Sequence, residues 1–395
     1  MACDVLQAFA TATENLDQDI IRIPSHADVF TGAIPKGSFD KNRGVNKTLF
    51  TMQHSEPPTD QPAYSNITLD GNGQPTPQCT DAFTDVALSY YTRNYGPKQS
   101  KLRGPEICRE QLEFQHNIGE FLGGYVNELG RYSKRFFEFL LREDYLSFAT
   151  AAVDPAAGGP GFYPGPNAFS TMPTPQSDLT QDTLDLVADY LIDVGATEPD
   201  SNGYIMNGGE GPLFTLLVNR IRSSNIVVNN SDRRQDARYA MPNELWKRVN
   251  ATRVIGNFRH VPIGNAPRAN LVGGTMTRVN TYNAVTSITG QQLTTAYLTA
   301  QYEGAIVLLP TVFQADIVTP FNWNFDNTLN YLGDWSFIQG GWRVDSNGAT
   351  CADPLGNRGR HFAEFKYAPK PILPYTGVVI WYKRCANTTH YAYCS

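Results

Sequence analysis

The sequence predicts an α+β protein that begins with an extended arm, continues into a long helix and ends in β strands. Residues 1–103 contain strand-like pieces but almost no closed apolar core. Residues 106–148 follow a helical apolar pattern, and the apolar runs after residue 212 are bounded by Gly, Pro and Asn, as β strands are. Because the arm cannot bury itself, we expect it to lie on the rest of the chain or on another copy of it.

The arm contains a predicted hairpin. Residues 49–52 and 64–69 are strand-like, prolines lie between them, and Asp70-Gly71-Asn72-Gly73 is a turn signal. A lone hairpin is at best marginally stable in water, so it should rest on another surface. We therefore expect Phe50 and Tyr64 to contact a neighbouring subunit. A loosely ordered tail is the alternative interpretation.

One apolar stripe predicts the long helix of residues 106–148. Its members lie three or four residues apart, the spacing of one helix face: Ile118, Leu122, Tyr125, Leu129, Tyr132, Phe136 and Leu140. An unbroken helix of this length would measure about 60 Å. Glycines between residues 119 and 130 predict a bend. We interpret the aromatic stripe as core packing along the backbone of an elongated lobe.

A Pro/Gly-rich loop at residues 151–175 marks a boundary, and a shorter helix is predicted after it, from Leu179 to Gly195. Asp178 or Thr180 is the expected N-cap, and Gly195 the stop. One side of this helix carries an acidic ridge of Asp182, Asp185, Asp189 and Asp193. Such a ridge is usually a solvated face, although carboxylates could also hold calcium or perform acid–base chemistry.

The stretch from Arg220 to Arg268 is strongly basic. We hypothesise that it meets the acidic ridge of a neighbouring subunit, with Arg233, Arg234 and Arg238 in the contact. Complementary charges set the orientation of such contacts. The remaining segments predict strands at 213–218, 254–258, 305–312, 317–321, 362–367 and 377–383.

The composition suits a protein that contacts other proteins. Charged residues make up 18% of the chain, and the formal net charge of -6 argues against broad neutralisation of nucleic-acid phosphates. No apolar run is long enough to span a membrane, and the N-terminus shows no secretory signal. We expect no membrane partner.

No catalytic or metal-binding motif is evident. The sequence lacks a phosphate-binding loop, a His-Glu-x-x-His pair and a Gly-x-Ser-x-Gly elbow. Cys385, His390 and Cys394 could contribute to a zinc site but lack a paired Cys-x-x-Cys, and the scattered cysteines fit a reducing compartment. We predict no catalytic residue, metal or cofactor. A carbohydrate-active enzyme that uses carboxylates such as Glu303 and Asp316 stays a less favoured alternative.

The order of these parts resembles the major capsid protein of tailed bacteriophages, the Hong Kong ninety-seven fold. The resemblance covers nearly the whole chain and is carried by four family-like stretches: Leu179 to Gly195, Gly211 to Val218, Arg234-Gln235-Asp236-Ala237-Arg238-Tyr239 and Arg253 to Phe258. It implies an N-arm at 1–40, an E-loop at 41–103, a peripheral domain with the spine helix at 104–149, an axial domain at 150–330 and return strands of the peripheral domain at 331–395.

The resemblance also implies a structural, non-enzymatic subunit. Hexamers and pentamers would form an icosahedral head around double-stranded DNA, with arms and loops lying across adjacent subunits. Portal, scaffold and cement proteins would be further partners, and assembly would occur in the cytoplasm of a host bacterium. Some members form Lys-Asn crosslinks, but no residue here matches that chemistry. A different β-rich virion protein, from a tail or a decoration layer, is the main alternative.

Overall fold

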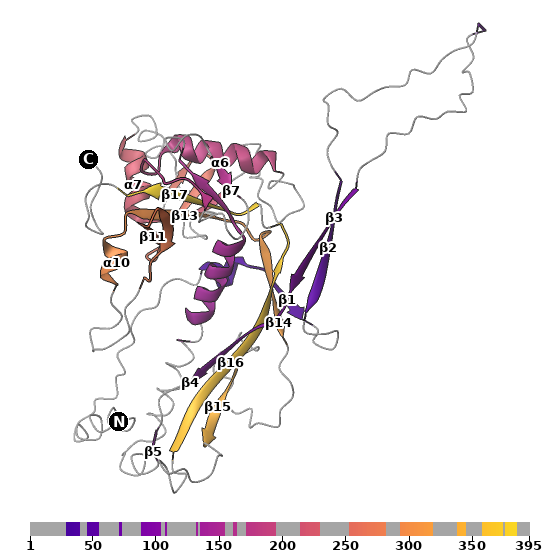
Figure 1. Cartoon of the computed structure of the whole chain (residues 1–395), viewed down its shortest axis with the longest axis vertical. Coiled ribbons are helices and arrows are strands. Elements are labelled where there is room, and N and C mark those ends of the chain that lie inside the picture. The colour runs from indigo at the N-terminus through magenta and orange to yellow at the C-terminus, as the bar shows by residue number, and fades with distance from the viewer. Residues whose placement is uncertain are drawn as a thin grey trace.

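Two large sheets and a separate two-stranded ribbon make up the described part of the chain (Figure 1). The computed structural model describes residues 29–39, 46–54, 71–72, 88–103, 107–108, 132, 135–154, 161–163, 171–194, 214–229, 253–281, 293–318, 338–344, 358–373 and 376–384.

The nine-stranded sheet lies at the centre of the main core. Its order is β7-β6-β17-β13-β8-β10-β9, and the hairpin β11–β12 joins it where β11 pairs with β13. The strands are β6 (Thr150–Val153), β7 (Phe162–Tyr163), β8 (Phe214–Val218), β9 (Arg253–Ile255), β10 (Phe258–Pro262), β11 (Arg268–Val272), β12 (Thr275–Arg278), β13 (Tyr302–Leu308) and β17 (Val378–Lys383). Strands β8, β13 and β17 are mostly apolar and almost wholly buried, as expected for strands with both faces covered.

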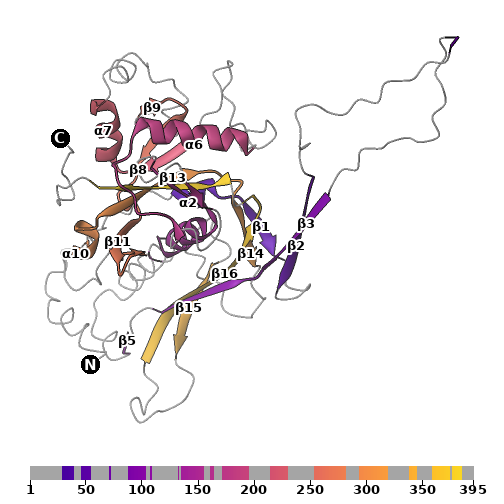
Figure 2. The ribbon, with the colours of Figure 1, turned by 45° about the horizontal axis from the view of Figure 1, so that its top comes forward.

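Helices cover the two faces of this sheet (Figure 2). On one side lie α6 (Gln181–Asp193) and α7 (Arg220–Asn229), and on the other lie α2 (Val29–Ala33) and the helix of residues 135–148. The Tyr145 hydroxyl donates to the Val307 carbonyl at 2.5 Å and accepts the Leu309 N–H at 3.0 Å. This pair of bonds attaches the 135–148 helix to the end of β13.

The predicted shorter helix is confirmed as α6. Thr180 is its N-cap, and its hydroxyl accepts the Thr183 N–H at 3.3 Å. Its apolar face, including Leu184 and Leu191, is fully buried against the sheet. A short helix, α10 (Thr295–Leu298), precedes β13 and is capped in the same way by Thr294.

The six-stranded sheet extends away from the main core and is built on the long strand β16 (Figure 1). Its path is β1-β14-β16-β15, and β4 and β5 also pair with β16. The strands are β1 (Lys36–Phe39), β4 (Lys98–Arg103), β5 (Ile107–Cys108), β14 (Phe313–Val318), β15 (Ile338–Val344) and β16 (Arg358–Pro371). β14, from the predicted axial range, lies in this sheet, whereas β17, from the predicted return range, lies in the other. The proposed domain boundaries stay predictions.

The ribbon pairs two strands that the sequence did not predict to be partners. β2 (Lys47–His54) is antiparallel to β3 (Leu88–Tyr95), a pairing that the sequence did not predict, and the expected pairing of 49–52 with 64–69 stays a prediction. A turn is present at Gly71–Asn72, and residues 64–69 lie outside the described part. The tyrosine-rich segment 88–95 suits this pairing because aromatic residues favour strands.

Three other expectations need correction. Residues 107–108 form β5 and pair with β16, so the long helix does not begin near residue 106; residues 135–148 are helical, and 109–131 lie outside the described part. The predicted strand 254–258 is a hairpin, because Gly256 turns the chain with a φ of 55° between β9 and β10. The predicted strand 317–321 is displaced toward the N-terminus, to β14.

Part of the N-terminal arm is buried by its own chain. Phe30, Ile34 and Phe39 are core residues, and β1 runs parallel to β14. Glu138 accepts the Phe30 N–H at 2.7 Å and both the N–H and the hydroxyl of Thr31, at 2.7 and 2.6 Å. The expectation that the arm cannot bury itself is therefore wrong for residues 29–39. Residues 1–28 lie outside the described part.

Phe30→Ala tests this assignment. We expect it to lower the free energy of unfolding of the unassembled chain by about 3–5 kcal/mol, the usual cost of removing a buried phenylalanine ring. Denaturant titration followed by circular dichroism measures the change. Ser38→Ala, at an exposed position of β1, is the matched control and should stay within about 0.5 kcal/mol. Equal, small effects would show that residues 29–39 are not part of the core.

Candidate functional site

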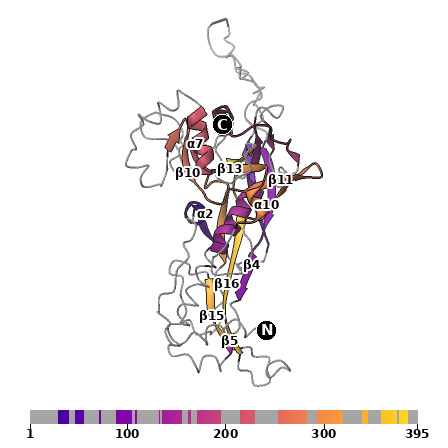
Figure 3. The same ribbon diagram turned by 90° about the vertical axis from the view of Figure 1, so that its left-hand side faces the viewer.

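The ribbon β2–β3 presents the first predicted contact residue. Phe50 is 67% exposed and lies on a ribbon that projects from the rest of the described chain (Figure 1), on the side of the molecule that is turned away from the viewer in Figure 3. Its neighbour Thr48 donates its hydroxyl hydrogen to Asn94 Oδ1 across the ribbon at 2.8 Å. A large apolar side chain among polar neighbours, on a strand pair with no further described strand, is suited to burial by another molecule. Tyr64 lies outside the described part.

The base of the ribbon is fixed to the six-stranded sheet. Tyr95 packs edge-on against Phe39, with ring centres 6.1 Å apart, and its hydroxyl donates to Asp316 Oδ2 at 3.4 Å. Lys47 Nζ lies 4.1 Å from the centre of the Phe39 ring. Beyond Tyr95, the chain passes through Gly96-Pro97 directly into β4. Phe50 is therefore presented from an anchored base.

The acidic ridge occupies the outward side of α6. Asp182, Asp185, Asp189 and Asp193 are all exposed, and no basic residue lies in the last turn of the helix. Asp185, Asp189 and Asp193 follow one another at spacings of four, so like charges repel, and the last two also oppose the helix dipole. A helix that keeps this arrangement has a surface well suited to a cationic partner.

Two arginines of the basic stretch are buried, although the whole stretch was expected to contact a neighbouring subunit. Arg222 and Arg268 are 2% and 1% exposed, so these two side chains are inside their own subunit and cannot contact another. Arg233, Arg234 and Arg238 lie outside the described part. The hypothesis of a contact between the ridge and the basic stretch therefore depends on those three residues.

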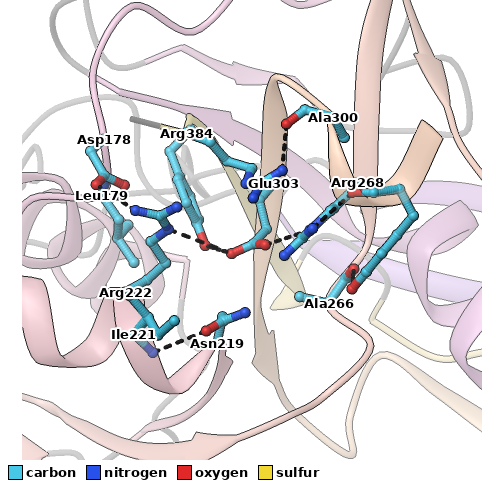
Figure 4. Close-up of polar contacts among 12 residues, drawn as sticks. Asp178, Leu179, Asn219, Ile221, Arg222, Ala266, Arg268, Ala300, Glu303 and Arg384 are labelled. Carbon is cyan, nitrogen blue, oxygen red and sulfur yellow. Dashed lines mark hydrogen bonds and ion pairs between the residues drawn. The ribbon is translucent and has the colours of Figure 1, made fainter. Parts of the chain in front are cut away.

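Arg222 and Arg268 belong to a buried ionic network around Glu303 (Figure 4). Glu303 is 0% exposed, and its Oε2 accepts Arg268 Nε at 2.7 Å. Its Oε1 accepts the Tyr382 hydroxyl at 2.5 Å and lies 4.0 Å from Arg222 Nε. Arg222 also binds Asp178 at 3.2 Å. One carboxylate thus connects β11, β13, β17 and α7, and through Arg222 the N-terminal approach to α6.

The network shifts the pKa values of two of its members, Tyr382 and Asp178. Burial, followed by the charge of Glu303, holds the pKa of Tyr382 well above its ordinary value, so the phenol stays protonated and donates. Burial raises the pKa of Asp178, and the nearby Arg222 guanidinium opposes that rise. The sequence carried one signal of this network: Glu303 is the charged residue in the otherwise apolar β13, and a buried charge needs partners.

The architecture of the described chain is similar to that of solved structures. The chain is similar to the structure of the Cyanophage Pam1 capsid asymmetric unit, with a TM-score of 0.51 and 12% sequence identity over 95% of this chain and 98% of that one. The chain has a phage capsid fold. The capsid of Ralstonia phage GP4 aligns with a TM-score of 0.48 and 11% identity, covering 95% of this chain and 96% of that one. No protein-family model matches the chain, and no curated protein matches its sequence.

Within this capsid fold, the carboxylates considered for glycoside hydrolysis lie in different sheets. Glu303 is on β13 of the nine-stranded sheet and is held by Arg268 and Tyr382, whereas Asp316 is on β14 beside Tyr95. A hydrolytic pair would need both carboxyl groups on either side of one glycosidic bond. The structure does not bring these two together.

Asp316 gives the capsid fold a pH-dependent contribution to stability. Burial raises its pKa, while Lys370, the Tyr95 hydrogen bond and Lys47 oppose the rise without cancelling it. Protonation therefore favours the folded state: this contribution is fully present below the unfolded pKa and is lost as the pH rises through the folded pKa. We expect Asp316→Asn to gain stability relative to the parent chain as the pH rises through that window. Unfolding titrations of unassembled chains in a pH series measure this; a pH-independent difference, like that expected for Ser38→Ala, would contradict it.

The described residues of the capsid fold contain no group of three or more His, Cys, Asp or Glu side chains able to hold a metal ion. Cys385, His390 and Cys394 lie outside the described part. No helix in the described ranges is long and apolar enough to cross a membrane.

Proposed function

We propose that this chain is the major capsid protein of a tailed bacteriophage. Copies arranged as hexamers and pentamers build an icosahedral head that encloses double-stranded DNA without sequence-specific contacts. Assembly takes place in the cytoplasm of the host bacterium, and portal, scaffold and cement proteins are further partners. The single observation that carries the proposal is the likeness of nearly the whole chain to the Cyanophage Pam1 capsid structure.

The exposed apolar surface of the chain supports self-assembly. Besides Phe50, two aromatic side chains are exposed: Tyr132, and Phe139 on the 135–148 helix. Tyr132, Phe136 and Phe139 stack in series, with ring centres 6.2 and 6.4 Å apart. Aromatic side chains of this kind are enriched in the buried centres of protein interfaces. In a shell of identical subunits, these surfaces would be covered by neighbouring copies.

The net charge of the chain fits a container rather than a nucleic-acid-condensing coat. The formal net charge is -6, and four of the carboxylates that contribute to it are exposed on the acidic ridge of α6. A shell that is filled with DNA by another machine needs no lining that neutralises phosphates.

The charge hypothesis for the subunit contact has a direct test. We expect the double variant Asp185→Lys/Asp189→Lys to reduce particle yield strongly, because it reverses the charge that the basic segment of the neighbouring subunit meets. Combining it with Arg233→Glu/Arg234→Glu should restore part of the yield. Sedimentation of cell lysates measures the particle fraction. Wild-type yield from both double variants would remove the ridge from the interface.

The function itself is tested by purifying the chain, expressed alone and with scaffolding partners, and examining it by negative-stain electron microscopy. Closed heads support a capsid protein. Tubes or small rings would indicate a tail or decoration protein, and a monodisperse monomer that hydrolyses glycosides would indicate the enzyme alternative.

A further inference from the structure

Arg384, directly after β17, has one edge of its guanidinium without a partner among the described residues. Its Nη1 donates to the carbonyl oxygens of Leu298 and Ala300, at 3.1 and 2.6 Å. Its Nε and Nη2 atoms are buried, and neither has a hydrogen-bond acceptor in the described part of the chain. The whole residue is 4% exposed. Bulk water does not satisfy these donors.

The geometry of the guanidinium makes this a two-donor fork. The Nε–H and Nη2–H bonds lie on the same edge of the planar group and point in nearly the same direction, the arrangement that binds anions at two points. A buried donor left without an acceptor destabilises the folded state, and the cost is larger when the group is charged. A single acceptor placed between these two donors would satisfy both of them.

The charges around the fork favour an anion. Figure 4 shows Glu303 between Arg222 and Arg268, with Arg384 close by. In this cluster the described residues carry three guanidinium groups but two carboxyl groups, Glu303 and Asp178, and both oxygens of Glu303 already accept other donors. Burial lowers the pKa of Arg384, and repulsion from Arg268 and Arg222 adds to the effect. Among these five described residues, the formal positive charge exceeds the negative charge by one.

We propose that the Nε/Nη2 edge of Arg384 binds a small monovalent inorganic anion of the chloride class. A neutral water molecule could accept both hydrogen bonds but would leave the excess positive charge uncompensated. An anion supplies the acceptor and the missing negative charge together, and so completes the network around Glu303. This binding site is independent of the subunit contacts proposed above.

The experiment compares anions at equal ionic strength. The unassembled full-length chain is unfolded thermally in sodium chloride, sodium bromide and sodium gluconate series. We expect chloride and bromide to raise the midpoint in a saturable manner, as ligands that bind only the folded state do, and gluconate to fail. A bromide-soaked crystal should give one anomalous difference peak within hydrogen-bond distance of Arg384 Nε and Nη2.

Two variants separate the fork from general salt effects. Arg384→Lys keeps the charge but removes the two-donor edge, so the saturable chloride effect should disappear. Arg220→Gln, at an exposed position of α7, should keep it. If Arg384→Lys fails to fold, the anion comparison and the bromide map on the parent chain still decide. Stabilisation that follows ionic strength whatever the anion, or a map that shows only water at the fork, would overturn the proposal.

Discussion

Replacing Glu303 with alanine is expected to destabilise the folded chain by about 3–5 kcal/mol, the cost of breaking a buried ion pair from one side. The reason is that Arg268 would remain inside the core with no carboxylate at its Nε, and Arg222 would lose a neighbouring negative charge. The Tyr382 hydroxyl, fully buried, would lose its acceptor as well. Chemical denaturation of the unassembled variant, followed by tryptophan fluorescence and circular dichroism, gives the change in unfolding free energy.

The matched control is Asp189→Asn, which removes a carboxylate from the exposed ridge and should change stability by no more than about 0.5 kcal/mol. Glu303→Leu combined with Arg268→Met removes one charge of each sign and should recover part of the loss, since apolar replacements of both partners are often neutral. Were Glu303→Ala no more harmful than Asp189→Asn, the network would have no role in holding the sheet to α7 and β11.

Phe50→Glu is expected to prevent particle assembly while leaving the subunit folded. Because Phe50 is 67% exposed in the single chain, its replacement removes little buried surface there. A buried aromatic anchor contributes about 2 kcal/mol or more to a subunit contact, which is roughly 30-fold in the association constant of each contact. The loss is repeated at every contact of a shell. Analytical ultracentrifugation of lysates measures the particle fraction, and thermal unfolding of the soluble subunit measures its fold.

Phe50→Leu is the control, since it keeps an apolar side chain at the same place on β2 and should still permit assembly. Thr92, which lies opposite Phe50 on β3, offers a second position on the same ribbon: Thr92→Ser should assemble normally. Particles from Phe50→Glu in normal yield would show that this part of the ribbon is not at a subunit contact.

Elements with complete local signals were predictable from the sequence. For α6, a cap at Thr180 and an apolar stripe coincide, and both were found. For β8 and β17, continuous apolar runs of strand length predicted strands that are buried on both faces. These segments need no information from distant parts of the chain, because their own pattern fixes both the element type and the buried face.

Pairing over long distances was not predictable in the same way. The partner of β2 lies beyond the turn at Gly71–Asn72, and nothing local to β2 distinguishes residues 88–95 from 64–69. Likewise, the docking of residues 29–39 depends on Glu138 and β14, which are far away in sequence. The start of the long helix was predicted too early. Residues 107–108, which the predicted helix includes, form the strand β5 instead.

In the candidate site, too, features set by the local sequence were predictable, and features set by distant contacts were not. Exposure of Phe50 and of the aspartates on α6 follows from local pattern and was foreseen. The burial of Arg222 and Arg268 was not, because an arginine-rich segment looks solvent-facing until a buried carboxylate such as Glu303 is placed beside it. A charged residue inside an apolar strand is the one local sign that such a network exists.

The central claim is that copies of this chain complete one another's exposed surfaces in a closed shell. Electron cryomicroscopy of the assembled protein, at a resolution that shows side chains, tests it most directly. We predict an icosahedral shell in which Phe50 of each subunit is buried against an adjacent copy. A well-resolved assembly that leaves Phe50 and the α6 ridge in solvent, or a chain that stays monomeric whether expressed alone or with candidate scaffolding proteins, would contradict it.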